Sequence, residues 1–261
     1  MSELVIEGLG RTFPGVKGGK PTVALQPTNL TVPANDFVTI LGPSGCGKST
    51  LLRIIAGLDQ PTTGRVMLDG VEIKRPGLDR GMVFQSYTLF PWLTVEDNIA
   101  FGLREKGMPA AQRRDIVASY IDKVGLKGFE KHWPKQLSGG MQQRTAIARA
   151  LANDPKILLL DEPFGALDNQ TRGLMQELLL GIWERESKMV LFVTHDIEEA
   201  IFVGSRVVTM SARPGRIKSI VPVDLPHPRE YTIKSSPEFS RLRAHLTEEI
   251  RSEAILADKA H

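Results

Sequence analysis

A glycine-rich run in the first fifth of the chain has the residue types of a phosphate-binding loop. Gly42-Pro-Ser-Gly-Cys-Gly-Lys48-Ser49 matches the pattern G-x-x-x-x-G-K-[ST], and Thr50 follows it. Glycines let the backbone curl so that successive N–H groups converge on phosphate oxygens, and a helix that begins there adds the positive end of its dipole. Lys48 would reach the β- and γ-phosphates of a nucleotide, and the Ser49 hydroxyl would bind Mg²⁺.

The alternative is a plain glycine-rich turn between a strand and a helix. Eight positions agree in type with the motif, the apolar run Phe37–Leu41 precedes it, and a helical pattern follows, so the nucleotide interpretation is favoured. Cys46 serves there as a small residue whose alkylation would block the site. The predicted nucleotide contacts of this loop are Gly42, Pro43, Ser44, Gly45, Cys46, Gly47, Lys48, Ser49 and Thr50.

A pair of acidic residues after a second apolar run could complete the chemistry. Four consecutive aliphatic residues, Ile157–Leu160, suit a strand covered on both faces, and Asp161 and Glu162 follow at its carboxyl end. Ligands of open α/β sheets bind at that end, so Asp161 is predicted to bind Mg²⁺. Glu162 could polarise a water for in-line attack on the γ-phosphate. The alternative is two acidic residues that merely end a strand.

A second glycine-rich helix start lies at Leu137-Ser-Gly-Gly-Met-Gln142. Ser138 followed by the N–H groups of Gly139 and Gly140 would form another anion site, because backbone donors at a helix start favour negative charge. The alternative is an N-cap serine with a turn. One chain would then carry two helix starts able to bind phosphate.

These residues require an α/β framework to position them. The predicted strands and helices, in chain order, are Leu4–Glu7, Leu30–Val32, Phe37–Leu41, a helix after Lys48, Arg65–Leu68, Gly81–Phe84, Ile157–Leu160, a helix within Gln170–Glu186, Met189–Val193 and Val207–Met210.

Residues 94 to 154 have a mostly helical pattern and interrupt this alternation of strands and helices. A capping box at Thr94 and Asp97 and a stop at Gly107–Pro109 predict one helix, and Ala110–Val124 and Met141–Ala152 predict two more. We therefore expect a domain over residues 4–235, with a helical subdomain inserted at about 88–154. Residues 236–261 are expected to form a helical tail, because Phe239, Leu242, Leu246, Ile250 and Ile255 recur at helical spacing.

Composition limits the class of protein and its partners. The 261 residues are 41% hydrophobic and 24% charged, which is ordinary for a globular protein. No apolar run approaches the roughly 20 residues of a membrane-spanning helix, and the first residues lack a secretory signal pattern. The single cysteine excludes a disulfide framework within the chain, so we expect a cytoplasmic protein. A net charge of +3 does not indicate a nucleic-acid partner.

With these motifs in this order, the sequence resembles the ATPase subunits of ATP-binding cassette (ABC) transporters from about residue 4 to residue 220. Leu137–Gln142 matches the family's signature sequence. The resemblance implies an α/β fold: a phosphate-loop NTPase (RecA-like) core, an N-terminal antiparallel β subdomain and an inserted α-helical signature subdomain. It also implies ATP and Mg²⁺ as cofactors, with Ser138, Gly139, Gly140 and Gln142 among the nucleotide contacts.

The resemblance assigns roles to four further residues. Phe13 falls where the family has an aromatic residue stacked on adenine, and Gln85 matches the glutamine that senses Mg²⁺ and the γ-phosphate. Asp168 ends the loop Gly165-Ala-Leu-Asp, which crosses between two cassettes, and His195 matches the histidine that contacts the γ-phosphate. Without the resemblance, Phe13 would be interpreted as a core residue, Gln85 as an exposed polar residue and His195 as structural.

In the family, two cassettes pack head to tail, and each ATP lies between one phosphate loop and the partner's signature helix. The chain is therefore expected to pair with a second ATPase subunit, identical or related. Only 90 positions separate Lys48 from Ser138 (138 − 48), which leaves no room for the long coiled coil of the DNA-repair relatives. The resemblance favours an importer ATPase with two separate membrane permease subunits and, indirectly, a solute-binding protein. A non-transport partner, or an export or lipid-handling system, stays open as an alternative.

Two further segments bear on the type of transporter. Phe90-Pro-Trp92-Leu lies where the family has a groove for a coupling helix of the membrane subunit, although Trp92 could instead be a core aromatic residue. Ser211-Ala-Arg-Pro-Gly-Arg-Ile217 and Val223-Asp-Leu-Pro-His-Pro-Arg229 resemble the nitrate/sulfonate/taurine importer branch. The ATPase does not touch the cargo, so the solute itself stays open.

Overall fold

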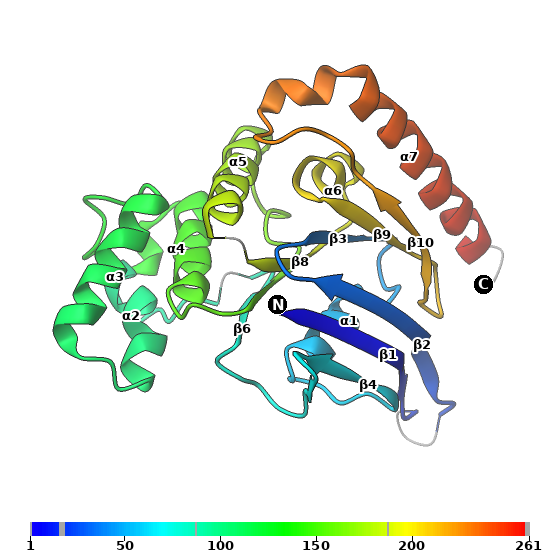
Figure 1. Cartoon of the computed structure of the whole chain (residues 1–261), viewed down its shortest axis with the longest axis horizontal. Helices are drawn as coiled ribbons and strands as arrows, with labels where there is room; N and C mark the ends of the chain where they lie inside the picture. Colours follow the sequence, from blue (N-terminus) through cyan, green and yellow to red (C-terminus); the bar gives the residue numbers. More distant parts are fainter. Residues whose placement is uncertain (1, 16–18, 87, 187, 259–261) are drawn as a thin grey trace. The chain divides into compact units, whose positions relative to one another are not determined.

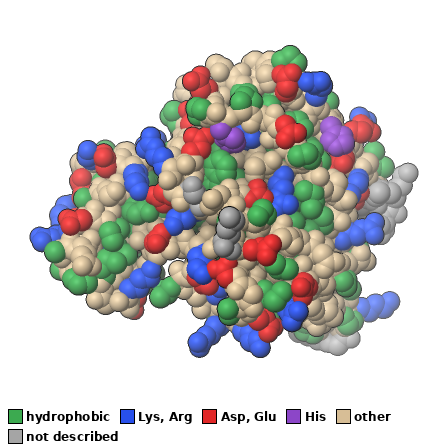
Figure 2. All heavy atoms as spheres, viewed as in Figure 1, with side chains coloured by type: hydrophobic (Ala, Val, Ile, Leu, Met, Phe, Trp, Pro, Cys, Tyr) green, Lys and Arg blue, Asp and Glu red, His purple; other side chains and the backbone are tan. Residues whose placement is uncertain are grey.

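The computed structural model describes residues 2–15, 19–86, 88–186 and 188–258, which form two compact units (Figure 1). The first unit comprises Met1–Gly77 and Ser187–His261, and the second comprises Leu78–Glu186. In the described ranges no helix is both long enough and apolar enough to cross a bilayer. Figure 2 shows acidic and basic side chains mixed over the visible face, as the small net charge leads one to expect.

An antiparallel sheet in the first unit carries the N-terminal segment. Its strands are β1 (Glu3–Phe13), β2 (Thr22–Pro33), β4 (Thr63–Leu68) and β5 (Val71–Glu72), in the order β2-β1-β4-β5. Leu4 of β1 lies opposite Val32 of β2 and Leu68 of β4, and all three side chains are buried. Alternate residues of an antiparallel strand point to the same face, so this row forms the apolar side of the sheet.

The other strands of the first unit are β8 (Met189–Thr194), β3 (Phe37–Leu41), β9 (Arg206–Met210) and β10 (Ile217–Pro222). β3 pairs in parallel with β8 and with β9, and β10 pairs antiparallel with β9. Every residue of β3 and β8 is buried, as expected for parallel strands with both faces covered. Helices α1 (Lys48–Ile55) and α6 (Ile197–Val203) each pack against β8, and α6 also contacts β3.

The C-terminal tail closes over α6. After the 3-10 helix η3 (Tyr231–Ser235), helix α7 (Pro237–Asp258) runs along the first unit beside α6, drawn in orange to red in Figure 1. Phe239 and Leu246 of α7 are fully buried, which confirms the amphipathic helix predicted there. The buried guanidinium of Arg229 donates to the carbonyls of Ile201, Phe202 and Gly204 at the end of α6, where a cation is favoured by the helix dipole.

The second unit combines a pair of parallel strands with a group of helices. Its elements are β6 (Arg80–Val83), α2 (Val95–Glu105), α3 (Ala110–Lys123), η2 (Pro134–Gln136), α4 (Gly139–Leu151), β7 (Ile157–Asp161) and α5 (Asn169–Glu186). Val83 of β6 lies opposite Leu160 of β7. Helix α2 contacts both α3 and α4, and α4 packs on β6. The helices predicted from the periodicity of residues 94 to 154 are confirmed, with their ends displaced by one or two residues.

Local capping explains where α2 begins. The Thr94 hydroxyl accepts from the amide of Asp97 at 3.2 Å and donates to the Asp97 carboxylate at 2.8 Å. Thr94 therefore caps the helix as predicted, although the carboxylate accepts from the threonine hydroxyl and not from its backbone N–H. Gly107 adopts φ +69° just after the helix, which confirms the predicted stop.

Candidate nucleotide site

The glycine-rich loop leaves the end of β3 and leads into α1. Gly45 and Gly47 have φ values of +74° and +97°, which residues with a side chain rarely adopt. A Cβ on Gly47 would also stand 2.7 Å from Cδ2 of Leu25 and 2.9 Å from the carbonyl oxygen of Ala24. The tight curl expected for a phosphate-binding loop is therefore present, and its shape depends on these two glycines.

The loop presents donors and a cation suited to phosphate. Because α1 begins at Lys48, the N–H groups of its first turn have no carbonyl partner within the helix, and Gly47 provides no side-chain cap. The Lys48 side chain is buried, and its Nζ donates to the carbonyls of Gly42 at 2.8 Å and Pro43 at 3.1 Å. A charged donor close to the amides of a helix start fits an anionic phosphate group.

His195 leaves the same edge of the sheet as the loop. Leu41, the last residue of β3, lies opposite Thr194, the last residue of β8, so Gly42 and His195 begin the next segments side by side. His195 is exposed. The residue after it, Asp196, caps α6 by accepting from the amide of Glu199 at 3.0 Å. The sheet register thus brings the predicted histidine to the phosphate loop within the first unit.

Phe13 ends β1 and is only half-buried. The guanidinium of Arg11 lies 4.5 Å from the centre of its ring, and that guanidinium is also paired with Asp59 at 2.7 Å. Phe13 is therefore not one of the fully buried core aromatics, which include Phe37 and Phe192. Stacking of Phe13 on adenine stays a prediction.

The acidic pair and the glutamine meet at one end of the second unit's strands. Val83 of β6 pairs with Leu160 of β7, and Gln85 and Glu162 each follow two residues after this pair. Gln85 Nε2 donates a hydrogen bond to Glu162 Oε2 at 3.4 Å. Asp161 is buried at the end of β7, and Glu162 is half-buried. Glu162 has φ +45°, a left-handed conformation that is uncommon for a residue with a side chain and that clusters at functional sites.

The chemistry of these side chains fits a magnesium ion. Mg²⁺ prefers oxygen ligands and is commonly bound by a hydroxyl or one or two carboxylates together with substrate phosphates. Within the second unit the buried Asp161 carboxylate is a group of this kind, and within the first unit the Ser49 hydroxyl at the start of α1 is another. In the described ranges, no group of three or more His, Cys, Asp or Glu residues could hold a metal. A bound metal would thus depend on phosphate oxygens as well.

The second glycine-rich helix start is open to solvent. Ser138 and Gly139 are exposed, and the Ser138 hydroxyl accepts from the amide of Met141 at 3.3 Å, so the serine caps α4. The Gln142 side chain does not extend outward, because its Nε2 donates to the Leu137 carbonyl at 3.2 Å. Within the second unit, the segment is therefore a capped helix start, and its exposed residues Ser138 and Gly139 are accessible to a ligand from solution or from another chain.

Asp168 lies close to this helix start. Its Oδ1 accepts from the amide of Thr171 at 3.0 Å, and this hydrogen bond lowers the pKa of the Asp168 carboxyl. A Cβ on Gly140 would stand 2.6 Å from Cγ2 of Thr171, so the starts of α4 and α5 are in contact. The signature segment and the predicted crossing loop are therefore joined through this contact, and Ser138, Gly139 and Asp168 beside it are exposed.

Two contacts were not foreseen from the sequence. Arg213 Nε donates to the carbonyl of Gly45 at 3.2 Å, which places the Ser211–Ile217 motif against the phosphate loop. The motif itself was noticed, but only as a mark of one importer branch. Trp92 is 66% exposed, with its ring 5.6 Å from that of Phe90, so the alternative of a core aromatic residue is wrong.

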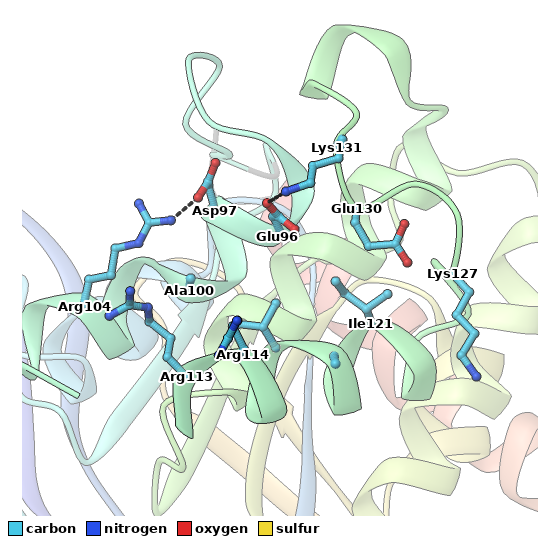
Figure 3. Close-up of a pocket in the computed structure, with 12 residues that line it drawn as sticks. Glu96, Asp97, Ala100, Arg104, Arg113, Arg114, Ile121, Lys127, Glu130 and Lys131 are labelled. Atoms are coloured by element: carbon cyan, nitrogen blue, oxygen red, sulfur yellow. Dashed lines mark hydrogen bonds and ion pairs between the residues drawn. The ribbon is translucent and has the colours of Figure 1, made fainter. Parts of the chain in front are cut away.

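A separate cavity of about 370 Å³ lies among α2, α3 and the segment that follows α3 (Figure 3). Ion pairs between Arg104 and Asp97 and between Lys131 and Glu96 lie at its rim. Burial acts to raise the pKa of Asp97, but the hydrogen bonds from Thr94 and Arg104 outweigh it, and the pKa is lowered. None of the predicted nucleotide or metal residues lines this cavity.

Comparison with protein families gives one match. The model described as "ABC transporter" matches residues 25–165, which include the phosphate loop, the signature segment and the acidic pair. The match covers more than half of the chain.

Named relatives extend the similarity to almost the whole chain. A nitrate import ATP-binding protein of Synechocystis sp. is 48% identical over 260 residues, with 94% of this chain and 97% of the relative covered. An aliphatic sulfonates import ATP-binding protein of Bacillus licheniformis is 50% identical over 236 residues, with 90% of each covered.

A solved structure shows the same architecture. The ATP-binding cassette MJ0796, in a dimeric post-hydrolysis state bound to ADP and Pi, is 36% identical and superposes with a TM-score of 0.75. The alignment covers 85% of this chain and all of that one. This likeness confirms the mixed α/β cassette fold, with an antiparallel sheet, a sheet of parallel strands and a set of helices.

Proposed function

The chain belongs to the ABC transporter family as an ATP-binding ATPase, and we propose that it powers a solute importer from the cytoplasmic face of the membrane. The observation that carries the proposal is that two relatives named for import, one of nitrate and one of sulfonates, are 48% and 50% identical over nearly the full length.

The phosphates of ATP are proposed to bind the loop of the first unit. Lys48 would exchange its bonds to the Gly42 and Pro43 carbonyls for phosphate oxygens, and the amides of Gly45 to Thr50 would surround the same phosphates. His195 supports this assignment because it begins beside the loop, where it could contact the γ-phosphate. Phe13 would stack on the adenine.

The second unit is proposed to supply the hydrolytic residues. Glu162 would accept the proton of the attacking water, and its hydrogen bond with Gln85 would hold that carboxylate in place. Asp161, with Ser49 of the first unit and with Gln85, would hold Mg²⁺. When bound, the ion would neutralise charge on the phosphate oxygens. All four residues lie at strand ends or helix starts, where ligands of α/β proteins bind.

Two copies are proposed to act together, head to tail. Ser138 and Gly139 of one copy would bind the γ-phosphate of the ATP held by the other, and Asp168 would lie at the same junction. The exposure of these residues, and the contact between the starts of α4 and α5, support that assignment. The similar cassette MJ0796 is dimeric in its ADP- and Pi-bound state.

A small oxyanion is the proposed type of solute, in the nitrate, sulfonate or taurine class. Nitrate and sulfonates both carry a planar or tetrahedral oxyanion group, and the relatives named for them are similarly close to this chain. The Ser211–Ile217 and Val223–Arg229 segments resemble the same branch. Separate permease subunits and a solute-binding protein would recognise the solute itself.

The exposed Trp92 offers a test of the transporter assignment. We would reconstitute the ATPase in lipid vesicles with a permease and a solute-binding protein identified from the neighbouring genes. Trp92→Ala should keep basal ATP hydrolysis within a few fold of wild type but lose stimulation by the permease and the loaded binding protein. Because the side chain is 66% exposed, its removal should change the melting temperature little.

Matched variants make the result interpretable. Trp133→Ala removes another exposed tryptophan, 41% accessible, from the same unit and should leave stimulation intact. Glu162→Gln defines the hydrolysis-deficient baseline, since an amide cannot accept the proton and turnover should fall on the order of a hundredfold or more. Full stimulation of Trp92→Ala would contradict the proposed coupling surface. Absence of any stimulation of the wild-type protein would contradict the importer assignment.

A further inference from the structure

We propose that Arg213 is a positioning residue of the phosphate loop: its guanidinium fixes the Gly45 carbonyl outward, so that the next amide, that of Cys46, faces the bound phosphate. The inference rests on the proposed function, because it takes the loop to be the nucleotide site. It adds a residue that is 168 positions from Gly45 in the sequence to the groups that shape the loop.

The contact between Arg213 and the loop is close and directional. Arg213 Nε donates to the Gly45 carbonyl at 3.2 Å. A Cβ on Gly45 would stand 2.4 Å from Nη2 and 3.0 Å from Nε of the same guanidinium. The planar group therefore lies directly against the tip of the loop, and a side chain at position 45 would displace it.

The hairpin that carries Arg213 is hydrogen-bonded to β2 and touches the same loop. Gly215 donates its N–H to the Ala24 carbonyl at 3.1 Å and accepts from the amide of Gln26 at 2.8 Å. A Cβ on Gly215 would stand 1.8 Å from the carbonyl oxygen of Cys46, so the two backbones touch. The Ser211 hydroxyl closes the hairpin by donating to the Pro214 carbonyl at 3.2 Å. The backbone contacts of Gly215 with β2 and with Cys46 thus hold Arg213 against the loop.

The direction of the loop amides follows from peptide geometry. In a trans peptide the C=O and N–H groups point to opposite sides. The Gly45 carbonyl faces Arg213 and the Cys46 carbonyl faces Gly215, so the N–H groups of Cys46 and Gly47 point away from the hairpin. On that side, within the curl of the loop, the Cys46 amide makes a long bond of 3.4 Å to the Pro43 carbonyl. A phosphate oxygen would be a stronger acceptor for that amide.

The charge of Arg213 suits the same role. Its side chain is exposed, and among the described residues it forms no ion pair. Arginine stays protonated at any relevant pH, so a positive charge always lies beside the loop. A cation bound to a peptide carbonyl also polarises the peptide, which strengthens its N–H as a donor.

The reactivity of Cys46 can report on the contact between Arg213 and the loop. Cys46 is the only cysteine and is fully buried in the loop, so a thiol reagent reaches it only when the loop opens. In the protein without nucleotide, Arg213→Ala should raise the rate of Cys46 modification several-fold. The matched control is Arg216→Ala, which removes the same charge from an exposed position of the same hairpin. Its modification rate should equal that of wild type.

Nucleotide binding provides the second measurement. By calorimetry, Arg213→Ala should bind ADP roughly three- to tenfold more weakly, the effect expected for an exposed charge-assisted hydrogen bond. Arg213→Lys, which retains a charged donor, should recover part of the loss, and Arg216→Ala should bind as wild type does. Melting temperatures of all variants should agree, because both arginines are exposed.

Three results would overturn the inference. The first is that Arg213→Ala has both the Cys46 modification rate and the ADP affinity of wild type. The second is that Arg213→Ala and Arg216→Ala change these two quantities equally. The third is that Arg213→Lys recovers none of the lost ADP affinity. Failure of the proposed function is distinguishable from these, because it would appear as a wild-type protein that binds no ADP, whatever the reactivity of Cys46.

Discussion

Helices α1 and α4 both begin after a glycine-rich segment, yet their first residues are arranged differently. The residue before α1 is Gly47, in a left-handed conformation, and it provides no side-chain cap. The residue before α4 is Ser138, in an extended conformation, and its hydroxyl already accepts from the amide of Met141. A buried lysine begins α1, whereas the first turn of α4 holds no charged residue.

This difference separates two tasks that look alike in the sequence. The start of α1 has amides with no carbonyl partner inside the helix, a curled backbone and a cation, so it can bind a phosphate group by itself. The start of α4 offers a serine hydroxyl and a helix dipole without a cation, which favour an anion more weakly. A phosphate that another copy's α1 has already bound would suit α4 better than free phosphate. The comparison thus predicts that damage to the two helix starts has different consequences.

The largest effect is expected for Ser138→Arg. The long cation would occupy the space where the other copy's γ-phosphate should meet α4, so hydrolysis should fall about a hundredfold, as when a transition-state donor is removed. ATP binding to a single copy should change little, because the phosphate loop is untouched. Filter binding at low protein concentration and a coupled ATPase assay would measure the two quantities.

Mixing provides the control for this variant. A head-to-tail pair of Ser138→Arg and Lys48→Ala proteins contains one site with both defects and one site with neither, so activity could return in the mixture if one site can work alone. Normal hydrolysis by Ser138→Arg alone would show that the signature segment plays no part in the site.

An intermediate effect is expected for Lys48→Ala, which acts on binding and not on pairing. Lys48 Nζ is a buried charged donor, and a hydrogen bond with a charged group contributes about 1.5–3 kcal/mol, so ATP affinity should fall roughly 10- to 100-fold. Calorimetric titration with ATP would measure the loss. Lys156→Ala, which removes a lysine just before β7, serves as the control. Unchanged ATP affinity in Lys48→Ala would argue against the phosphate-loop assignment.

The smallest effect is expected for Ser138→Ala, measured as stability without nucleotide. Loss of an N-cap costs about 1 kcal/mol, which lowers the melting temperature of a protein of this size by roughly 2–4 °C. Ser138→Gly should cost only a few tenths of a kcal/mol, because glycine is itself an acceptable N-cap. Equal melting temperatures of wild type and Ser138→Ala would mean that the hydroxyl does not cap α4.

The sequence predicted the helices and strands that have a clear local pattern of residues. β3, β7 and β8 are runs of apolar residues, and α2 begins and ends at residues that cap and stop helices. Elements without such patterns were missed. Helix α6 has only seven residues, and β10 alternates between half-buried and exposed residues at the edge of its sheet. Short or marginal elements form because neighbours cover them, and a local pattern does not contain those neighbours.

The burial of aromatic side chains also could not be predicted from local patterns in the sequence. Phe13 and Trp92 could each be a core residue or an exposed contact by type alone, because large aromatic side chains occur in both places. The fold leaves Phe13 half-buried under the Arg11 guanidinium and Trp92 largely exposed beside Phe90. Burial depends on which segments cover a side chain, and those segments come from other parts of the chain.

By itself, the sequence determined the local chemistry of the candidate site. The spacing of glycines with Lys48 and Ser49 dictates a curled loop before a helix, because only glycine readily takes the positive φ values found at positions 45 and 47. The tertiary structure alone decided which distant groups meet that loop. Arg213 lies 168 positions from Gly45, and it reaches the loop because β9 pairs with β3 and the chain turns back just after β9. Strand order results from the packing of the whole sheet, which local spacing does not encode.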